Sequence, residues 1–176
     1  MRVIVMGPQG SGKSTQAGRV AQEIGLPHLQ TGALYRQMAQ GDNKFARGVR
    51  SYLEQGKLVP DDAHDEILKN EVAKPEFQMG FVLDGTPRTL SQAQNLPFKP
   101  DKVIYLAVSD EENVKRLTLR GREDDTPKVI SERLCLYHQE TEPVLDYYRQ
   151  KGILEEVDGE RSIEVITQDI LGRLVR

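Results

Sequence analysis

Short apolar runs alternate along this chain with longer segments whose apolar residues recur every three or four positions. The short runs predict buried strands, and the longer segments predict helices that place one face on a core. The expected strands cover residues 2–6, 27–30, 81–84, 102–108 and 153–157, and the expected helices include 13–24, 43–55, about 61–73 and 162–175. Because strands and helices alternate, we expect an α/β fold with a parallel five-stranded sheet flanked by helices on both faces.

Capping residues mark several helix boundaries. We expect Thr31 to be the N-cap of the helix after the second strand, because its hydroxyl can accept a hydrogen bond from a free backbone N–H. Thr126 followed by Pro127 predicts the start of the longest helix. Pro143 should kink or break that helix, because proline has no N–H to donate.

Residues 7–15, which read GPQGSGKST, separate the first strand from the first helix. They fit the phosphate-loop pattern G-x-x-x-x-G-K-[ST]. Backbone N–H groups of such a loop surround a phosphate, Lys13 would reach the terminal phosphates, and the Ser14 hydroxyl would reach a bound Mg²⁺. A simple glycine turn is the alternative, but the strand and the helix on its two sides favour a phosphate loop.

Asp84 stands at the end of a buried strand, in the segment FVLDGTPRT. Since ligands of open parallel sheets bind at the carboxyl ends of the strands, residues 7–15, Asp84 and Arg88 should share one edge. In a chain with a phosphate loop, a carboxylate there would organise Mg²⁺. An aspartate that only starts a turn is the alternative interpretation.

Charge and composition exclude several classes of protein. The chain has 176 residues, 38% of them hydrophobic, which suits one domain. Its net charge is −3 without a long basic run, so nucleic acid is not expected as its main partner. Cys135 is the single cysteine, which excludes an intrachain disulfide and a four-cysteine zinc site, and we expect a buried structural thiol there.

The location of the protein is inferred from two absences in the sequence. The phosphate-loop pattern begins at residue 7, which leaves no room before it for a signal peptide. No apolar stretch approaches the length needed to span a membrane. We therefore expect a cytoplasmic protein with no membrane partner.

The number of arginines near the expected ligand edge indicates what kind of reaction the protein catalyses. Six of them border the expected ligand edge, which is more than one triphosphate needs: Arg36, Arg88, Arg116, Arg120, Arg122 and Arg133. Transfer of a phosphoryl group between two phosphorylated substrates would explain the surplus, although each arginine alone could form a surface ion pair. A GTP-binding switch is disfavoured, because the only Asn-Lys pair, Asn43-Lys44, is followed by Phe45-Ala46 and not by the guanine-reading aspartate.

Over nearly its whole length the chain resembles the adenylate kinases, a family of nucleoside monophosphate kinases with a phosphate loop. The segments that carry the resemblance are 7–16, 31–36, 56–61, 81–92, 116–133, 141–143 and 157–159. The resemblance implies reversible transfer from Mg²⁺-ATP to AMP, giving two ADP. It also implies a single domain 1–176, with a core at 1–30, 61–116 and 126–176, a monophosphate-binding helical flap at 31–60 and a very short lid at 117–125.

The resemblance also implies roles for individual residues. Catalysis would use Lys13, Asp84, Arg88, Arg122 and Arg133. ATP would contact Gly10, Ser11, Gly12, Lys13, Ser14, Thr15, Arg116, Arg120 and Arg161, and Mg²⁺ would be held by Ser14 and Asp84, through water at the latter. AMP would contact Thr31, Arg36, Lys57, Leu58, Val59, Gly85, Arg88, Gln92, Arg122 and Arg133, with the Gln92 amide pairing with the base edge.

Departures from the family pattern lie around both nucleotide sites. Ser14 replaces a usual glycine, Ala33 a usual acidic residue and Thr86 a usual large aromatic residue. The lid is shorter than the family's short form and cannot hold a zinc ribbon, so no zinc is expected. We expect a monomer. A kinase for UMP or CMP and a non-catalytic nucleotide-binding module are the alternatives, but Thr31 and Thr89 fit the AMP type better.

Overall fold

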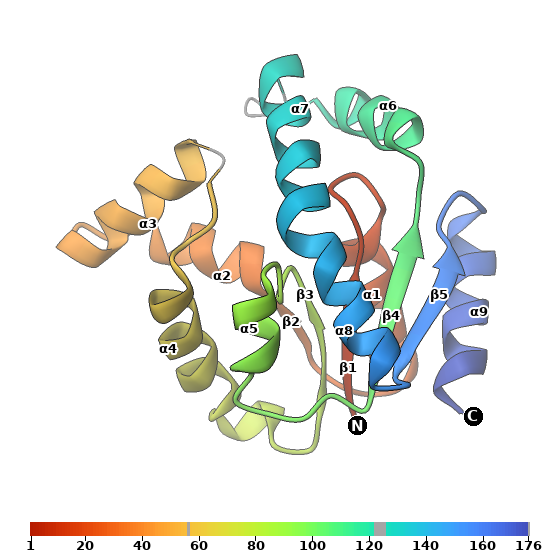
Figure 1. Ribbon diagram of the computed structural model, residues 1–176. Helices are drawn as coiled ribbons and strands as arrows, with labels where there is room; N and C mark the ends of the chain where they lie inside the picture. Colours follow the sequence, from red (N-terminus) through yellow and green to blue (C-terminus); the bar gives the residue numbers. More distant parts are fainter. Residues whose placement is uncertain (56, 122–125, 176) are drawn as a thin grey trace.

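Five parallel strands form the centre of the computed structural model, which describes residues 1–55, 57–121 and 126–175 (Figure 1). They are β1 (Arg2–Met6), β2 (His28–Gln30), β3 (Phe81–Asp84), β4 (Lys102–Ala107) and β5 (Leu154–Asp158). Their order in the sheet is β2-β3-β1-β4-β5. The predicted α/β class and the five strands are confirmed.

The strand register aligns the ends of the three strands that lead into the loops of interest. Val5 of β1 pairs with Asp84 of β3, and Asp84 also pairs with Gln30 of β2. The chain therefore leaves β1, β2 and β3 at one level of the sheet. Three loops that are distant in sequence start side by side there.

Helices cover both faces of the sheet (Figure 1). Their bounds are α1 Lys13–Glu23, α2 Thr31–Met38, α3 Lys44–Glu54, α4 Asp61–Val72, α5 Leu90–Gln94, α6 Asp110–Arg120, α7 Pro127–Leu136, α8 Glu142–Gln150 and α9 Ile163–Leu174. A 3₁₀ turn covers Pro75–Phe77, and a π turn at Tyr137–Thr141 joins α7 to α8.

Alternation along β1 shows how the sheet builds two cores. Val3 and Val5 are fully buried against α1 and α9, while Ile4 and Met6 are buried on the opposite face among residues of α4, α5 and α8. Successive side chains of a strand point to opposite faces, so a continuous apolar run serves both layers.

Two smaller apolar clusters hold the elements that overhang the carboxyl edge of the sheet. Ala39, Val49 and Val59 join α2, α3 and the segment before α4. Leu117, Ile130 and Leu134 join α6 to α7. Figure 1 shows these two groups of helices on either side of the sheet's carboxyl edge.

Helix boundaries mostly agree with the sequence. Thr126 accepts a hydrogen bond from the Val129 N–H as the N-cap of α7. The long helix is interrupted by the π turn immediately before Pro143, as its missing N–H predicted. The N-cap prediction for Thr31 is wrong, because Gln30 is the N-cap and the Thr31 hydroxyl donates instead to the Asp84 carbonyl.

Cys135 is exposed, so the prediction of a buried thiol is also wrong. The buried residues of α7 are Ile130 and Leu134, which are four positions apart and share one face. Cys135 follows Leu134 by one residue, a turn of about 100° that carries its side chain to the solvent.

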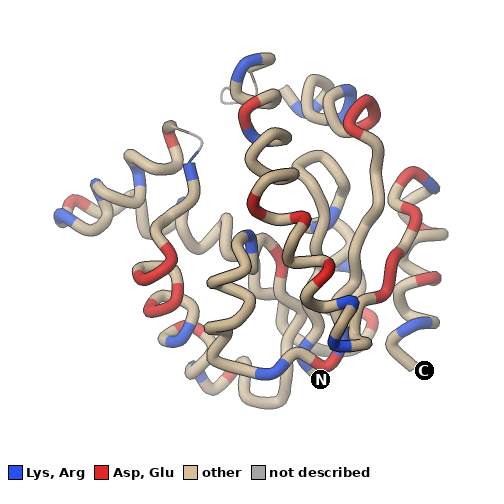
Figure 2. The backbone as a smooth tube through the Cα atoms, viewed as in Figure 1, with Lys and Arg blue, Asp and Glu red and all other residues tan. Residues whose placement is uncertain are grey.

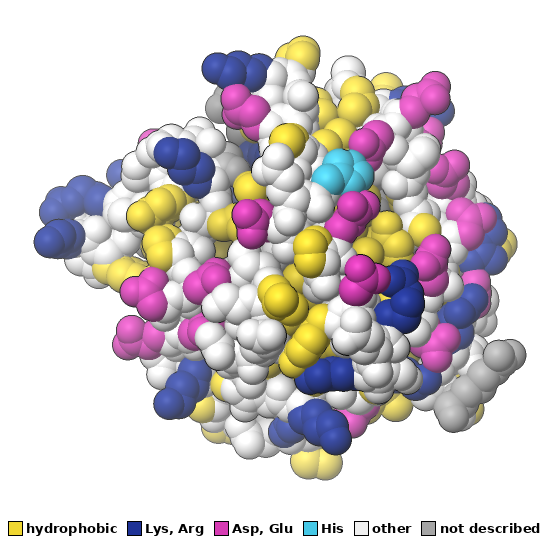
Figure 3. All heavy atoms as spheres, viewed as in Figure 1, with side chains coloured by type: hydrophobic (Ala, Val, Ile, Leu, Met, Phe, Trp, Pro, Cys, Tyr) yellow, Lys and Arg dark blue, Asp and Glu magenta, His cyan; other side chains and the backbone are white. Residues whose placement is uncertain are grey.

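Both signs of charge are interspersed along the chain (Figure 2) and on the face shown in Figure 3. Figure 2 shows a local asymmetry in which α3 carries mainly Lys and Arg, whereas the first part of α4 carries Asp and Glu. Among the described residues, no helix is long and apolar enough to cross a membrane.

The first prediction concerns Gly10, where the loop after β1 passes close to α6. Its φ is +92°, and a Cβ there would lie 2.8 Å from the carbonyl oxygen of Asn113. We expect Gly10→Ala to destabilise the protein by about 2 kcal/mol, because strain and contact with backbone act together. Thermal unfolding measures this change.

Gly172→Ala is the matched control. Gly172 lies within α9 and a Cβ there would meet nothing within 4 Å. Alanine should raise stability at this position by up to about 1 kcal/mol, because it has the higher helix propensity. Equal effects of the two substitutions would contradict the assignment of Gly10 as a close-packed position.

Candidate active site

An open cleft of about 420 Å³ lies at the carboxyl edge of the sheet, between the α2–α4 segment and the α6–α7 segment. The cleft is in the size range of ligand pockets, roughly 300–1,000 Å³. Its charged lining residues, among those described, are Lys13, Arg36, Lys57, Arg88, Arg116, Arg120, Arg133 and Asp84. Such an excess of positive charge suits ligands that carry several phosphates.

The loop after β1 adopts the geometry that the sequence predicted. Gly12 has φ +85° and is the N-cap of α1, so the first turn of that helix opens directly into the cleft. Free N–H groups and the positive end of the helix dipole therefore face the cleft. This arrangement binds phosphate groups in proteins generally.

Lys13 begins α1, and its ammonium donates a hydrogen bond to the Pro8 carbonyl, with an Nζ–O distance of 3.1 Å. Burial, together with the nearby charges of Arg88 and Arg120, lowers the pKa of Lys13 to about 8, against an opposing contribution from Asp84. An anion bound beside this ammonium would favour its charged form.

Ser14 and Asp84 meet at the junction of α1 and β3. The Ser14 hydroxyl donates to Asp84 Oδ1 at 3.1 Å, and His28 Nε2 lies 2.6 Å from Asp84 Oδ2. Hydroxyl and carboxylate oxygens are the ligands that Mg²⁺ prefers, usually together with water and phosphate oxygens. This oxygen pair therefore fits Mg²⁺, and the described residues contain no cluster of three or more His, Cys, Asp or Glu that could hold a metal ion.

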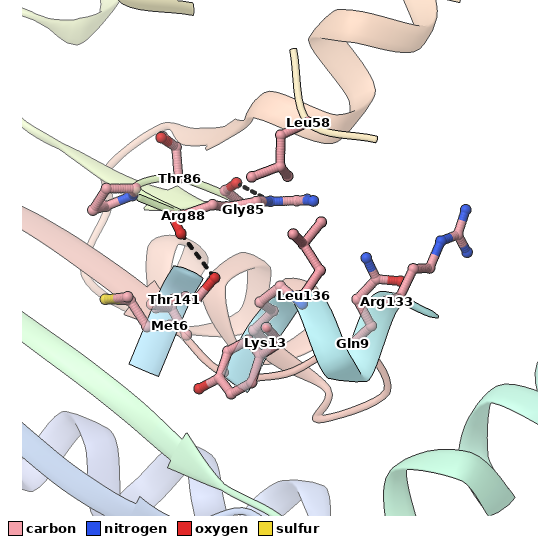
Figure 4. Close-up of a pocket in the computed structure, with 14 residues that line it drawn as sticks. Met6, Gln9, Lys13, Leu58, Gly85, Thr86, Arg88, Arg133, Leu136 and Thr141 are labelled. Carbon is pink, nitrogen blue, oxygen red and sulfur yellow. Dashed lines mark hydrogen bonds between the residues drawn. The ribbon is translucent and has the colours of Figure 1, made fainter. Parts of the chain in front are cut away.

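Arg88 lines the cleft and is held through both its side chain and its backbone. Its Nε donates to the Gly85 carbonyl at 2.8 Å, and its carbonyl accepts from the Thr141 hydroxyl at 2.9 Å (Figure 4). It lines both the cleft and a smaller pocket of about 40 Å³ that also includes Lys13, Leu58 and Arg133. Burial lowers the pKa of Arg88, and the neighbouring charge of Arg133 does so to a smaller extent.

Arg116 shows how the α6 side of the cleft is held. Its Nε donates to Glu112 within the same helix at 2.8 Å, and its Nη1 donates to the Gly159 carbonyl at 3.0 Å. These bonds orient the guanidinium at the rim of the cleft.

Gln92 is 3% exposed and lines the opposite side of the cleft. Its Oε1 accepts from the Arg88 N–H at 2.7 Å, and its Nε2 donates to Asp61 Oδ1 at 2.8 Å. The Thr89 hydroxyl donates to the other Asp61 oxygen at 2.9 Å. Contacts at both ends thus fix the orientation of the Gln92 amide.

A buried polar group beside Gln92 was missed by the sequence interpretation. His64, 2% exposed, contacts the Tyr35 hydroxyl through Nδ1 and the Thr86 hydroxyl through Nε2, the latter at 2.7 Å. Burial lowers the pKa of His64 to about 4, against an opposing contribution from Asp61. The only sequence signal was Thr86, where the resembled family has a large aromatic residue.

Most residues predicted for the site lie together in the cleft. Its lining contains Gly10, Gly12, Lys13, Ser14, Thr15, Arg36, Lys57, Leu58, Val59, Asp84, Gly85, Arg88, Gln92, Arg116, Arg120 and Arg133. Ser11 and Thr31 are buried next to it and are not lining residues. Arg161 is not a lining residue either, and its guanidinium pairs with Asp169 at 2.6 Å. Arg122 lies outside the described residues.

Comparison with known proteins gives consistent matches. The family model described as adenylate kinase matches residues 5–153. A protein named adenylate kinase from Nocardia farcinica is 38% identical over 183 residues, covering 100% of both chains. Proteins of the same name from Archaeoglobus fulgidus and Thermobifida fusca are 36% and 35% identical, covering 97% and 96% of this chain and 96% and 95% of the relatives.

A prediction follows from the burial of His64. Its pKa in the folded protein, about 4, lies below the usual 6.5, so the unfolded chain binds the proton first. The stability that neutral His64 provides is present above pH 6.5 and is lost as the pH falls towards 4, by up to about 3 kcal/mol. Urea unfolding of the wild type and of His64→Gln between pH 7 and 4 should show the wild type losing more stability.

His138→Gln is the control with the opposite sign. His138 is exposed, and hydrogen bonds to Asp110 and Glu142 raise its pKa. Its contribution, reduced by solvent screening, is present at low pH and fades as the pH rises. Parallel pH profiles for the wild type and His64→Gln would contradict a buried neutral imidazole.

Proposed function

The chain belongs to the adenylate kinase family and is a phosphotransferase, and we propose the cleft at the carboxyl edge of its sheet as the site of transfer between Mg²⁺-ATP and AMP. The observation that carries this proposal is the position of Lys13 and Arg88. Both line the cleft, from the start of α1 and the loop after β3 respectively, so cations would stand at the junction of two binding sites.

ATP would occupy the α1 and α6 side of the cleft. The N–H groups at the start of α1 and the Lys13 ammonium would bind its β- and γ-phosphates. Arg116 and Arg120 would lie against the base and the phosphates, since both line this side. For Arg161, whose guanidinium pairs with Asp169, a role towards ATP stays a prediction, as does a role for Ser11.

AMP would occupy the α2 and α4 side. Arg36 and Arg88 would bind its phosphate, because a guanidinium offers paired donors that match phosphate oxygens. Lys57, Leu58 and Val59 and the amide of Gln92 would enclose the adenosine, as their place in the lining supports. The Thr31 hydroxyl donates to the Asp84 carbonyl at 3.1 Å, and Thr31 would support the residues on this side of the cleft.

In the transfer, an oxygen of the AMP phosphate attacks the γ-phosphorus of ATP. The bond from that phosphorus to the β–γ bridging oxygen breaks, and both products are ADP. The protein supplies alignment of the two substrates and positive charge around the migrating group, without a covalent enzyme intermediate. Lys13, Arg88 and Arg133 are the described residues that would surround this group, and we propose Arg122 as a fourth.

We propose that Mg²⁺ binds near Ser14 and Asp84, whose oxygens lie 3.1 Å apart. When bound, the ion neutralises phosphate charge. Asp84 would orient it, directly or through water, while His28 holds the second carboxylate oxygen at 2.6 Å.

The division into a core, a flap at 31–60 and a lid at 117–125 remains part of the proposal. In its support, the segment around α2 and α3 has an apolar cluster of its own at Ala39, Val49 and Val59. The alignment with the Archaeoglobus fulgidus relative spans 208 positions, more than the 176 residues of this chain, so that relative carries residues that this chain lacks. A shortened lid agrees with that difference. Monomeric state and cytoplasmic location also remain predictions.

The choice of acceptor and the role of Arg88 are tested together. In an assay of ATP with AMP, CMP, UMP or GMP, AMP should give the highest kcat/KM.

Arg88→Ala should lower ADP formation by at least about 10³-fold, because the transferred phosphoryl group loses a charge-assisted partner. Arg19→Ala is a control, because Arg19 forms an exposed ion pair with Glu164. This substitution should leave ADP formation nearly unchanged. Unchanged ADP formation by Arg88→Ala would overturn the proposed site.

The pH dependence of ATP binding tests Lys13. Its pKa of about 8 in the free protein means that the ammonium loses its proton between pH 7 and 9. Since phosphate binding needs the charged form, the dissociation constant for ATP should rise about tenfold by pH 9. In Lys13→Arg the guanidinium does not titrate, so its profile should be flat over this range. Identical profiles would contradict a titrating Lys13 in the ATP site.

A further inference from the structure

Three side chains form a buried chain of hydrogen bonds that ends on Gln92. The Tyr35 hydroxyl meets His64 Nδ1, His64 Nε2 lies 2.7 Å from Thr86 Oγ1, and Thr86 Oγ1 lies 3.3 Å from Gln92 Oε1. His64, Thr86 and Gln92 are each at most 3% exposed. Tyr35, His64 and Gln92 also line the cleft.

The direction of every bond in this chain can be deduced from its two ends. The Arg88 N–H can only donate, so the Gln92 atom that it contacts at 2.7 Å is the oxygen. The Asp61 carboxylate, at 2.8 Å from the other amide atom, accepts from the nitrogen. The orientation of the Gln92 amide is therefore fixed, with its oxygen facing Thr86.

The remaining directions follow. Thr86 lies beside an oxygen that can only accept, so its hydroxyl donates to Gln92 Oε1. The same hydroxyl oxygen then accepts from His64 Nε2–H. His64 Nδ1 has no hydrogen and accepts from Tyr35, which makes the imidazole the neutral Nε2–H tautomer.

This arrangement determines what Gln92 can offer to a ligand. Its oxygen has two lone pairs, and the Arg88 N–H and the Thr86 hydroxyl use both. One amide hydrogen is used by Asp61. Among the described contacts, the second amide hydrogen is the remaining group, so Gln92 faces the cleft as a donor and not as an acceptor.

We propose that Thr86, positioned by His64 and Tyr35, determines how the acceptor site reads its base: Gln92 donates to a ring nitrogen or carbonyl oxygen of the base and does not accept from an exocyclic amino group. This inference rests on the proposed function, in which a nucleoside monophosphate binds beside Gln92. Thr86 and His64 act through Gln92 and are positioning residues.

The test compares two acceptors that differ only in the amino group, AMP and purine riboside 5′-monophosphate. Their dissociation constants are measured by calorimetry for the wild type, Thr86→Val and Thr86→Ser. Valine removes the hydroxyl and frees one lone pair of Gln92 Oε1, which can then accept from the amino group of AMP. The preference for AMP over the analogue should therefore rise about fivefold, the value of one neutral hydrogen bond.

Two variants separate this effect from a general loss of packing. Thr86→Ser keeps the hydroxyl and should keep the wild-type ratio of dissociation constants. Thr167→Val removes another buried threonine hydroxyl, which donates to Gln16 Oε1 at 2.7 Å between α9 and α1, away from the cleft. It should also keep the wild-type ratio. An unchanged ratio in Thr86→Val would overturn the proposal.

The tautomer of His64 gives a second readout, measured on the wild-type protein. Nitrogen NMR of the wild-type histidine rings at pH 7 should show one ring as the neutral Nε2–H tautomer, assigned to His64 by its loss in His64→Gln. A charged ring or the Nδ1–H tautomer there would also overturn the proposal. Wild-type turnover of AMP tests the proposed function separately, so the two can fail independently.

Discussion

Both halves of the cleft depend on the contacts of one residue, Asp84. Its carboxylate accepts from the Ser14 hydroxyl of the phosphate loop and contacts His28, and its backbone carbonyl accepts from Thr31 at the start of α2. Because β3 lies between β1 and β2 in the sheet, Asp84 can reach both neighbouring loops. At 2% exposure it is held against movement by packing as well as by hydrogen bonds. The phosphate loop and the start of α2, which lie on two sides of the cleft, are thus tied to one strand end.

The cleft gathers positive charge around that point. Burial is the main cause that lowers the pKa of both Lys13 and Arg88. The neighbouring charge of Arg88 also lowers the pKa of Lys13, and that of Arg133 lowers the pKa of Arg88. Such an arrangement is unfavourable in the free protein and becomes favourable when polyphosphate binds. The apolar layers on both faces of the sheet bury Val5 and Leu83 fully, near the ends of the strands from which the two loops start. The buried strands therefore supply stability, and the charged residues that follow them line the cleft.

The hydrogen-bonded chain from Tyr35 to Gln92 pairs polar groups that are buried beside the cleft. Polar groups that are buried must find partners, since each unpaired one costs free energy. His64 and Thr86 satisfy one another, and their combined directions leave Gln92 with a single free hydrogen towards the cleft. Packing and recognition are coupled here, because the same hydroxyl that completes a buried network also occupies the lone pair that a ligand would use. A purely apolar side chain at position 86 could not have this effect.

The sequence by itself determined the elements and most of the residues that line the cleft, because both are local. Apolar runs give the strands, and the residues of the loop at 7–15 and of the segment 81–89 carry their chemistry within a few positions. What depended on distant residues was decided by the tertiary structure. Cys135 was expected to be buried and is exposed, since the contacts of α6 select which face of α7 is covered. The Thr31 hydroxyl does not cap its helix, because it donates to the Asp84 carbonyl 53 residues away. His64 contacts Tyr35 and Thr86, which lie in two other segments. Periodicity indicates which side chains share a face, but hydrogen-bond partners across elements are chosen only when the sheet brings the loops together.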